Sequence, residues 1–286
     1  MFKRKILSKL EAWKQDERHK PLILRGARQV GKTTVVNEFG SQFDNYLYFN
    51  LEMSESVRLF EMDIPLNDLV NMLFASLGKL QKEGSTLIFI DEIQNSSKTI
   101  ALLRYFYEQR PDLYVIAAGS LLENLVDVNV SFPVGRVMYL ALRPCSFYEF
   151  LGAIGKNNLL TILSQKAEYT IAFHEQLMHQ FNQYTIIGGM PEAVQHYAET
   201  QDIIAIEDVY ETLVQAYKDD SEKYARSNKL TDVVRFILSY GWAFSRETIT
   251  LGNFANSGYK SREVGEAFRL LEKAMILELV YPVSST

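Results

Sequence analysis

The sequence contains little of the chemistry that builds covalent frameworks or zinc sites. Its single cysteine, Cys145, excludes a disulfide framework and a thiolate zinc cluster. Four histidines are scattered along the chain, and none is spaced i, i+4 from another, so no histidine metal pair on a helix is indicated; they are His19, His174, His179 and His196.

Long hydrophobic runs are also missing. The longest uncharged apolar stretch, Leu113–Leu122, is roughly half the length that a membrane-spanning helix needs. The amino-terminal segment MFKRKILSKL carries charges throughout and does not resemble a signal peptide. We therefore expect no membrane partner and a cytoplasmic location. The net charge of -5 argues against nucleic acid over the whole surface, although a local basic patch stays open.

At 286 residues the chain is long enough for two or three domains. Up to about Gly152, short apolar runs alternate with helical patterns, which predicts an α/β fold with crossover helices around a mostly parallel sheet. Unbroken apolar runs such as LIFI and YVIAA are typical of strands that are buried on both faces. The five predicted strands are 21–25, 46–51, 87–91, 113–118 and 137–142.

After Gly152 the strand pattern stops. Segments 157–198 and 202–226 have apolar residues at helical spacing, which predicts an all-helical region. Ser146 followed by Glu149 is a capping-box pattern that opens a short helix.

From about Leu230, the order is helix, strand 248–251, short helix, helix 261–275 and strand 277–283, with Gly258 in a tight turn. This order predicts a winged helix. The predicted domains are therefore an α/β domain over 1–152, a helical lid over 153–228 and a winged helix over 229–286.

The segment GARQVGKT matches G-x-x-x-x-G-K-[ST] in full, and it lies between the predicted strand PLILR and the predicted helix KTTVVNEF. Glycines in such a loop let backbone N–H groups surround phosphate oxygens, at the positive end of the following helix. Lys32 would reach the β- and γ-phosphates, and the Thr33 hydroxyl would complete a Mg²⁺ shell. The alternative is a glycine-bearing turn without a ligand. The predicted ATP-binding residues are Gly26, Ala27, Arg28, Gln29, Val30, Gly31, Lys32, Thr33 and Thr34.

The strand LIFI ends in two acidic residues, Asp91 and Glu92. Downstream of a P-loop, this pattern predicts that Asp91 holds Mg²⁺ and that Glu92 orients and deprotonates the attacking water. The alternative is a solvated strand end. The metal residues are thus Thr33 and Asp91, and the catalytic residues include Lys32 and Glu92.

One predicted strand, 46–51, separates the P-loop strand from the Asp91 strand in sequence. Together with the paired acids, this resembles the additional-strand, catalytic-glutamate division of P-loop NTPases. The resemblance implies that strand 113–118 lies between the P-loop and Asp91 strands. It also implies that Ser120 faces the γ-phosphate as a sensor; a helix N-cap is the alternative for this serine.

Arg136 stands just before the fifth strand in FPVGRVMYL. An arginine at this place in AAA-like proteins often reaches the nucleotide of a neighbouring subunit, which would make it catalytic and imply a homo-oligomer. Arginine suits that role because its planar guanidinium stays charged and bridges two phosphate oxygens. A local salt bridge at the strand end is the alternative.

The segment IGGMPE resembles the glycine-x-proline motif of STAND ATPases, whose proline packs on adenine from the lid. Gly189, Met190 and Pro191 would occupy that motif here. The alternative is a turn between two helices, because glycine pairs and a following proline are common turn residues.

Over residues 4–283 the chain resembles a bacterial and archaeal family of AAA-like ATPases. The shared motifs are a short helix with Trp13, then GARQVGKT, DEIQ, a glycine–serine pair, FPVGR, RPCSFYEF and GG-x-P. Members usually continue into a restriction-endonuclease-like domain, so we expect this chain to be a fragment, and no nuclease role carries over. The resemblance implies an ATP- and Mg²⁺-dependent hydrolase that switches its lid and winged helix.

Two other functions remain open at the level of sequence. The chain could be a nucleotide-gated binding module with little turnover, although an intact Glu92 favours hydrolysis. It could also be a DNA-binding protein that reads DNA through helix 261–275, which carries Arg262, Arg269 and Lys273 and follows Lys260. Glu263, Glu266 and Glu272 nearly cancel these charges and favour a packing role for the helix.

Overall fold

The computed structural model describes residues 2–119, 133, 135–165, 167–225 and 227–281. They form two compact units, residues 1–199 and 200–286. The predicted division into 1–152, 153–228 and 229–286 stays a prediction.

The first unit is built on a five-stranded sheet with the order β2-β3-β4-β1-β5. All neighbouring strands are parallel, as the apolar runs predicted. β4 lies between β1 and β3, so the inserted strand implied by the family resemblance is confirmed. The strands are β1 Leu22–Arg25, β2 Asn45–Asn50, β3 Thr86–Asp91, β4 Leu113–Gly119 and β5 Met138–Ala141.

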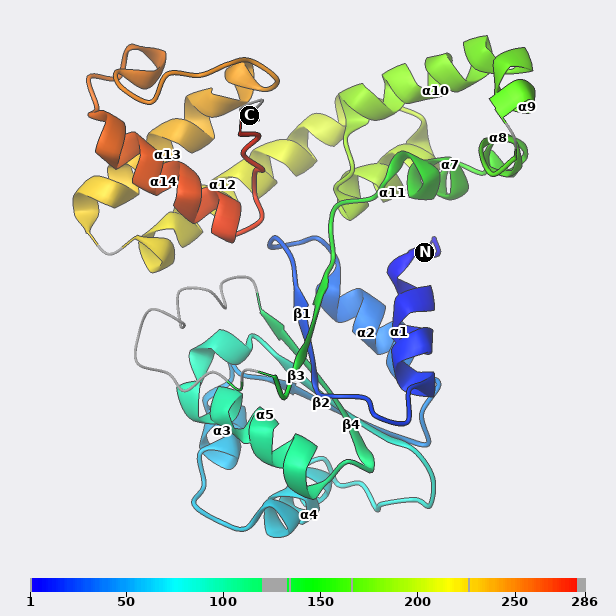
Figure 1. Ribbon diagram of the computed structural model, residues 1–286, viewed down its shortest axis with the longest axis vertical. Helices are drawn as coiled ribbons and strands as arrows, with labels where there is room; N and C mark the ends of the chain where they lie inside the picture. The colour runs from blue at the N-terminus through cyan, green and yellow to red at the C-terminus, as the bar shows by residue number, and fades with distance from the viewer. Residues whose placement is uncertain (1, 120–132, 134, 166, 226, 282–286) are drawn as a thin grey trace, which may run out of the picture. The chain divides into compact units, whose positions relative to one another are not determined.

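Helices cover both faces of this sheet (Figure 1). Because side chains alternate along a strand, Ile23, Ile88 and Val115 enter one core, while Leu22, Leu87 and Ile116 enter the other. The first core is closed by α3 Ser54–Phe60, α4 Leu66–Ser76 and α5 Ser97–Gln109, and the second by α1 Ile6–Gln15 and α2 Lys32–Gly40.

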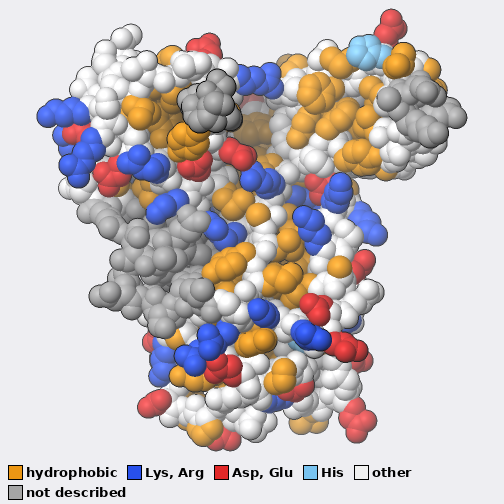
Figure 2. Space-filling view, in the orientation of Figure 1, with side chains coloured by type: hydrophobic (Ala, Val, Ile, Leu, Met, Phe, Trp, Pro, Cys, Tyr) orange, Lys and Arg blue, Asp and Glu red, His pale blue; other side chains and the backbone are white. Residues whose placement is uncertain are grey.

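After β5 the unit continues as helices. They are α7 Phe147–Ala153, α8 Asn157–Leu163, α9 Ala167–Ala172, α10 His174–Ile187 and α11 Pro191–Thr200. α7 begins with the predicted capping box, in which Ser146 and Glu149 exchange hydrogen bonds. Hydrophobic side chains gather on the surface over α8–α10 (Figure 2), and Met178, Phe181 and Ile186 of α10 are exposed.

The second unit is helical among its described residues. It contains η2 Ile204–Ile206, α12 Glu207–Tyr224, α13 Asn228–Tyr240, η3 Gly241–Phe244, η4 Phe254–Asn256 and α14 Ser261–Lys273. α13 packs against both α12 and α14. Gly258 has φ +74°, as its predicted place in a tight turn requires.

The strand predicted at 248–251 is wrong, and no strand forms at 277–281, where the second was expected. A strand needs a neighbouring backbone for its N–H and C=O groups. Here the Leu279 N–H instead donates to Glu272 Oε1 of α14 at 3.1 Å. Asn253 has φ +54°, so the backbone after 248–251 leaves the extended conformation. Residues 282–283 lie outside the described part, and the winged helix stays a prediction.

In the part of the chain that the structure describes, no helix combines the length and apolarity needed to cross a membrane.

Candidate nucleotide site

The site lies at the carboxyl edge of the sheet. Arg25, the last residue of β1, is paired with Gly119 of β4 and Ala141 of β5. Asp91 ends β3 in register with Asn50. Because parallel strands all point the same way, the carboxyl ends of β1, β3, β4 and β5 lie at one edge, where open α/β sheets bind their ligands.

The predicted P-loop, Gly26–Gly31, leads from β1 directly into α2. Gly31 has φ +92° at the start of the helix, a conformation that side-chain-bearing residues rarely adopt. The buried Lys32 ammonium donates to the carbonyl oxygens of Gly26 and Ala27, at 2.8 and 2.9 Å. Lys32 is therefore held over the loop that the motif assigns to phosphate.

Thr33 and Asp91 meet although they are far apart in sequence. The Thr33 hydroxyl donates to Asp91 Oδ2 at 2.6 Å, and the backbone N–H of Glu92 donates to Asp91 Oδ1 at 3.1 Å. A hydroxyl and a carboxylate beside a phosphate loop are oxygen donors of the kind that Mg²⁺ uses together with substrate phosphates. These two residues fit the predicted metal-binding role.

Glu92 follows Asp91 in a left-handed backbone conformation, with φ +52°. Its Oε2 accepts a hydrogen bond from the Gln94 side-chain amide. The other amide atom, Gln94 Oε1, is buried without a partner in the described structure. A non-glycine residue with positive φ is uncommon, and such residues cluster at functional sites.

Burial dominates the electrostatics of this cluster. It lowers the pKa of Lys32, against the opposing attraction of Glu92 and Asp91. It raises the pKa of Asp91 despite the hydrogen bond from Thr33, and it raises the pKa of Glu92 despite the hydrogen bond from Gln94. Shifted groups that converge in one place are typical of functional sites.

Pro191 lies next to the P-loop. A methyl group in place of the Gly31 hydrogen would lie 3.7 Å from Pro191 Cγ. The turn at 188–190 joins α10 to α11, as the glycines predicted. The motif is therefore a turn between two helices and also lies close to the P-loop. A cavity of about 440 Å³ opens here, lined by residues that include Phe2, Arg4, Gln29, Gly31, Pro191 and His196.

Residues 18–151 match the family model described as an AAA domain. With its P-loop motif and parallel sheet, this part of the chain has the α/β fold of AAA-like P-loop NTPases. Residues 178–286 match a second family, described as a domain of unknown function. None of the curated proteins matches the chain.

Among solved structures, this chain is similar to the Walker-type ATPase PABY2304 of Pyrococcus abyssi. The two are 16% identical with a TM-score of 0.55, over 96% of this chain and 90% of that one, which shows a shared fold. Similarity to PCH-2 of C. elegans is much weaker, with 15% identity and a TM-score of 0.33 over 54% of this chain and 46% of that chain. The Aeropyrum pernix ORC2 protein gives 15% identity and a TM-score of 0.32 over 54% and 49%.

Of the other residues predicted for catalysis, Ser120 lies outside the described residues, and Arg136 is not brought into this cluster. Arg136 precedes β5, and the backbone N–H of Met138 bonds the Pro21 carbonyl before β1, so Arg136 lies at the edge of the sheet opposite its own P-loop. Its Nε lies 2.6 Å from Glu108 Oε1, with 40% of the side chain exposed. The salt bridge is thus present, and the role toward a neighbouring subunit stays a prediction.

The basic residues proposed to read DNA lie on and beside α14. Arg262 and Arg269 are exposed, and so is Glu266. Glu263 pairs with Lys229 at 2.5 Å, while Val264, Phe268 and Leu271 are buried. α14 therefore packs through one face, which agrees with the packing interpretation. DNA contact stays a prediction.

Sequence reasoning missed Arg4 and Gln94. Arg4 stands in the charged segment MFKR and has no motif of its own, so its burial at 6% exposure had no signal in the sequence. Gln94 belongs to the DEIQ motif, but its bond to Glu92 depends on a backbone turn that the motif does not specify.

Proposed function

We propose that the chain binds Mg-ATP at this cluster and hydrolyses it. The observation that carries the proposal is the contact between Thr33 and Asp91 at 2.6 Å, directly beside a buried Lys32 on the loop. It joins the two halves of the nucleotide motif, from α2 and β3, at the edge where the fold binds ligands.

The residues divide the work as follows. Backbone N–H groups of the P-loop and Lys32 would hold the phosphates. Thr33 and Asp91 would hold Mg²⁺, which when bound supplies positive charge against the phosphate oxygens. Glu92 would orient a water and take its proton. Pro191 and Met190 would pack on the adenine beside the P-loop.

We further propose that ATP occupancy changes the arrangement of the helical segment α7–α11 and the second unit. Support comes from the proximity of Pro191 to Gly31, since a nucleotide there would touch both the loop and α11. We also propose that the chain forms a homo-oligomer. Arg136 lies at the edge of the sheet away from its own P-loop, so it could contact only the nucleotide of a neighbouring subunit. DNA contact through α14 is a weaker candidate because acidic residues share its exposed face.

The direct test is ATP binding by Lys32→Ala. The mutation removes the ammonium that the motif assigns to the β- and γ-phosphates, so we expect loss of Mg-ATP binding. The unfolding temperature of the parent should rise with ATP concentration, and the unfolding temperature of the variant should not. A variant stabilised by ATP as strongly as the parent would place the nucleotide elsewhere. ATP turnover is then measured with and without duplex DNA. Turnover without DNA indicates hydrolysis, binding without turnover indicates a nucleotide-gated binding module, and turnover that rises with DNA indicates DNA-dependent activity.

A further inference from the structure

Arg4 is a buried guanidinium that joins three separate segments. Its Nη1 donates to the Val30 carbonyl of the P-loop at 3.1 Å, and its Nη2 donates to the Arg143 carbonyl after β5 at 2.7 Å. Its Nε lies 3.0 Å from Glu149 Oε1 at the start of α7. All three nitrogens of the fork are therefore used, which a lysine could not reproduce.

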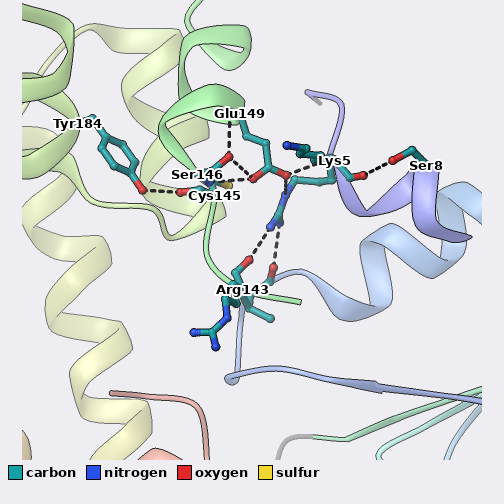
Figure 3. Close-up of polar contacts among 9 residues, drawn as sticks. Lys5, Ser8, Arg143, Cys145, Ser146, Glu149 and Tyr184 are labelled. Atoms are coloured by element: carbon teal, nitrogen blue, oxygen red, sulfur yellow. Dashed lines mark hydrogen bonds and ion pairs between the residues drawn. The ribbon is translucent and has the colours of Figure 1, made fainter. Parts of the chain in front are cut away.

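Glu149 completes this arrangement (Figure 3). Oε1 also accepts from the Lys5 backbone N–H at 2.8 Å, and Oε2 accepts from the Ser146 backbone N–H at 2.8 Å. Burial alone would raise the pKa of Glu149, but the hydrogen bonds from Ser146, Lys5 and Arg4 together hold it below its ordinary value. The carboxylate is thus charged and fully engaged at neutral pH.

Residues 143–149, which contain two of the partners of Arg4, in turn contact residues 188–191, which we call the Pro191 segment. The Cys145 N–H donates to the Gly189 carbonyl at 2.6 Å, and the Tyr184 hydroxyl donates to the Cys145 carbonyl at 2.7 Å, as Figure 3 shows for Tyr184. Pro191 follows two residues later and reaches Gly31. Contacts therefore run from the P-loop through Arg4, residues 143–149 and Gly189 back to the P-loop.

Stabilising the fold does not by itself explain why Arg4 and Glu149 are buried as an ion pair. Desolvating two charges costs free energy, and apolar side chains of similar volume often stabilise a fold as well or better. What the pair provides is geometry, because a rigid fork with three acceptors permits one relative placement of the segments it joins.

We propose that Arg4 and Glu149 are positioning residues that keep the Pro191 segment against the P-loop, so that they set the affinity for ATP. The inference rests on the proposed function. In Arg4→Gln and Glu149→Gln we expect the KM for ATP to rise at least about tenfold, the scale of losing a hydrogen bond to a charged group. The kcat should change by less than about twofold, because neither residue contacts the cluster of Lys32, Asp91 and Glu92 in the described structure.

The single cysteine supplies a second readout that does not require ATP. Cys145 lies within the segment 143–149 and is 1% exposed. If the pair keeps that segment in place, both variants should let a thiol reagent modify Cys145 at least about tenfold faster than the parent, without nucleotide. A parent that fails to bind ATP would overturn the proposed function and leave this comparison valid.

Arg110→Gln is the matched control. Arg110 forms an ion pair with Asp112 at 2.7 Å just before β4, at the other edge of the sheet. It should leave both the KM and the labelling rate unchanged. Equal effects in the control would indicate general loosening and overturn the proposal, as would parental KM and labelling in the Arg4 and Glu149 variants. Should Arg4→Gln fail to fold, Glu149→Gln, which keeps an acceptor oxygen, decides.

Discussion

At the scale of single residues, the candidate site depends on burying charges that would be solvated elsewhere. Lys32 and Asp91 are 6% and 3% exposed. Electrostatic attraction and hydrogen bonds offset part of the desolvation cost, and the rest appears as shifted pKa values. These buried charges would complement the negative phosphates and the cation of Mg-ATP, the ligand proposed for this site.

Glu92 gives a prediction at this scale. Burial raises its pKa above the ordinary 4.5, and a general base works only when deprotonated. As pH falls, hydrolysis should therefore begin to fail at a higher pH than an ordinary glutamate would set. The kcat profile of the parent against pH measures this acid limb.

The comparison variant is Glu92→Gln, which keeps shape and hydrogen bonding but cannot accept the proton. We expect ATP affinity near the parental value and turnover lower by roughly 10²-fold or more. Residual turnover should lack the acid limb assigned to Glu92. Hydrolysis by this variant at the parental rate would remove Glu92 from the catalytic role.

At the scale of elements, the turn between α10 and α11 leaves no room for a side chain at Gly189. A Cβ atom on Gly189 would lie 2.5 Å from the Cys145 carbonyl oxygen, closer than real Cβ contacts come. The backbone fixes the Cβ position, and the carbonyl oxygen is itself a backbone atom, so the clash cannot be relieved by rotating a side chain.

Gly189→Ala should therefore destabilise the first unit by about 1–3 kcal/mol and weaken ATP binding, since the turn must move away from residue 145. Denaturant unfolding and ATP titration measure the two effects. Gly152→Ala in α7 is the control: its new methyl group would meet only Leu160 Cδ1, at 4.0 Å, and alanine suits a helix interior better than glycine. Equal stability of the two variants would show that the turn has room to adjust.

At the scale of the whole molecule, the position of Arg136 raises the question whether one chain contains every residue of a complete ATPase site. Its distance from its own P-loop suits a neighbour's nucleotide, while its pairing with Glu108 suits a local salt bridge. The hydrogen bond from Arg136 and then that from Arg104 lower the pKa of Glu108, so the carboxylate has two competing partners.

If Arg136 acts in a neighbouring site, turnover per chain should rise with protein concentration. Arg136→Ala should lose turnover and keep ATP affinity, because the guanidinium stabilises charge that develops in the transition state. Mixing it with Lys32→Ala should restore activity, since a mixed oligomer rebuilds some complete sites. Arg104→Ala, which removes the other partner of Glu108, should remain active. Specific activity that is flat on dilution, with no recovery on mixing, would leave Arg136 a salt bridge.

The sequence alone was sufficient for the strands of the first unit and for two of its helices. Its five strands, the helix after GARQVGKT and the capped helix at Ser146 lie where they were predicted, to within about a residue. Apolar periodicity and capping are local, so the signals that specify these elements are contained in a few neighbouring residues. The motifs also selected Lys32, Thr33, Asp91 and Glu92, because phosphate and Mg²⁺ demand particular residue types in a particular order. The fold brings these residues together, and their roles toward phosphate and Mg²⁺ stay predictions.

Tertiary structure decided what depends on distant partners. The strand predicted at 248–251 did not form, because strand formation requires a neighbour that periodicity cannot reveal. The burial of Arg4 and its three contacts across 26 to 145 residues of sequence likewise have no local signature. Only the folded chain shows that an arginine in a charged leading segment lies against the phosphate loop, since hydrogen bonding of a buried charge is set by which backbone groups the fold brings to it.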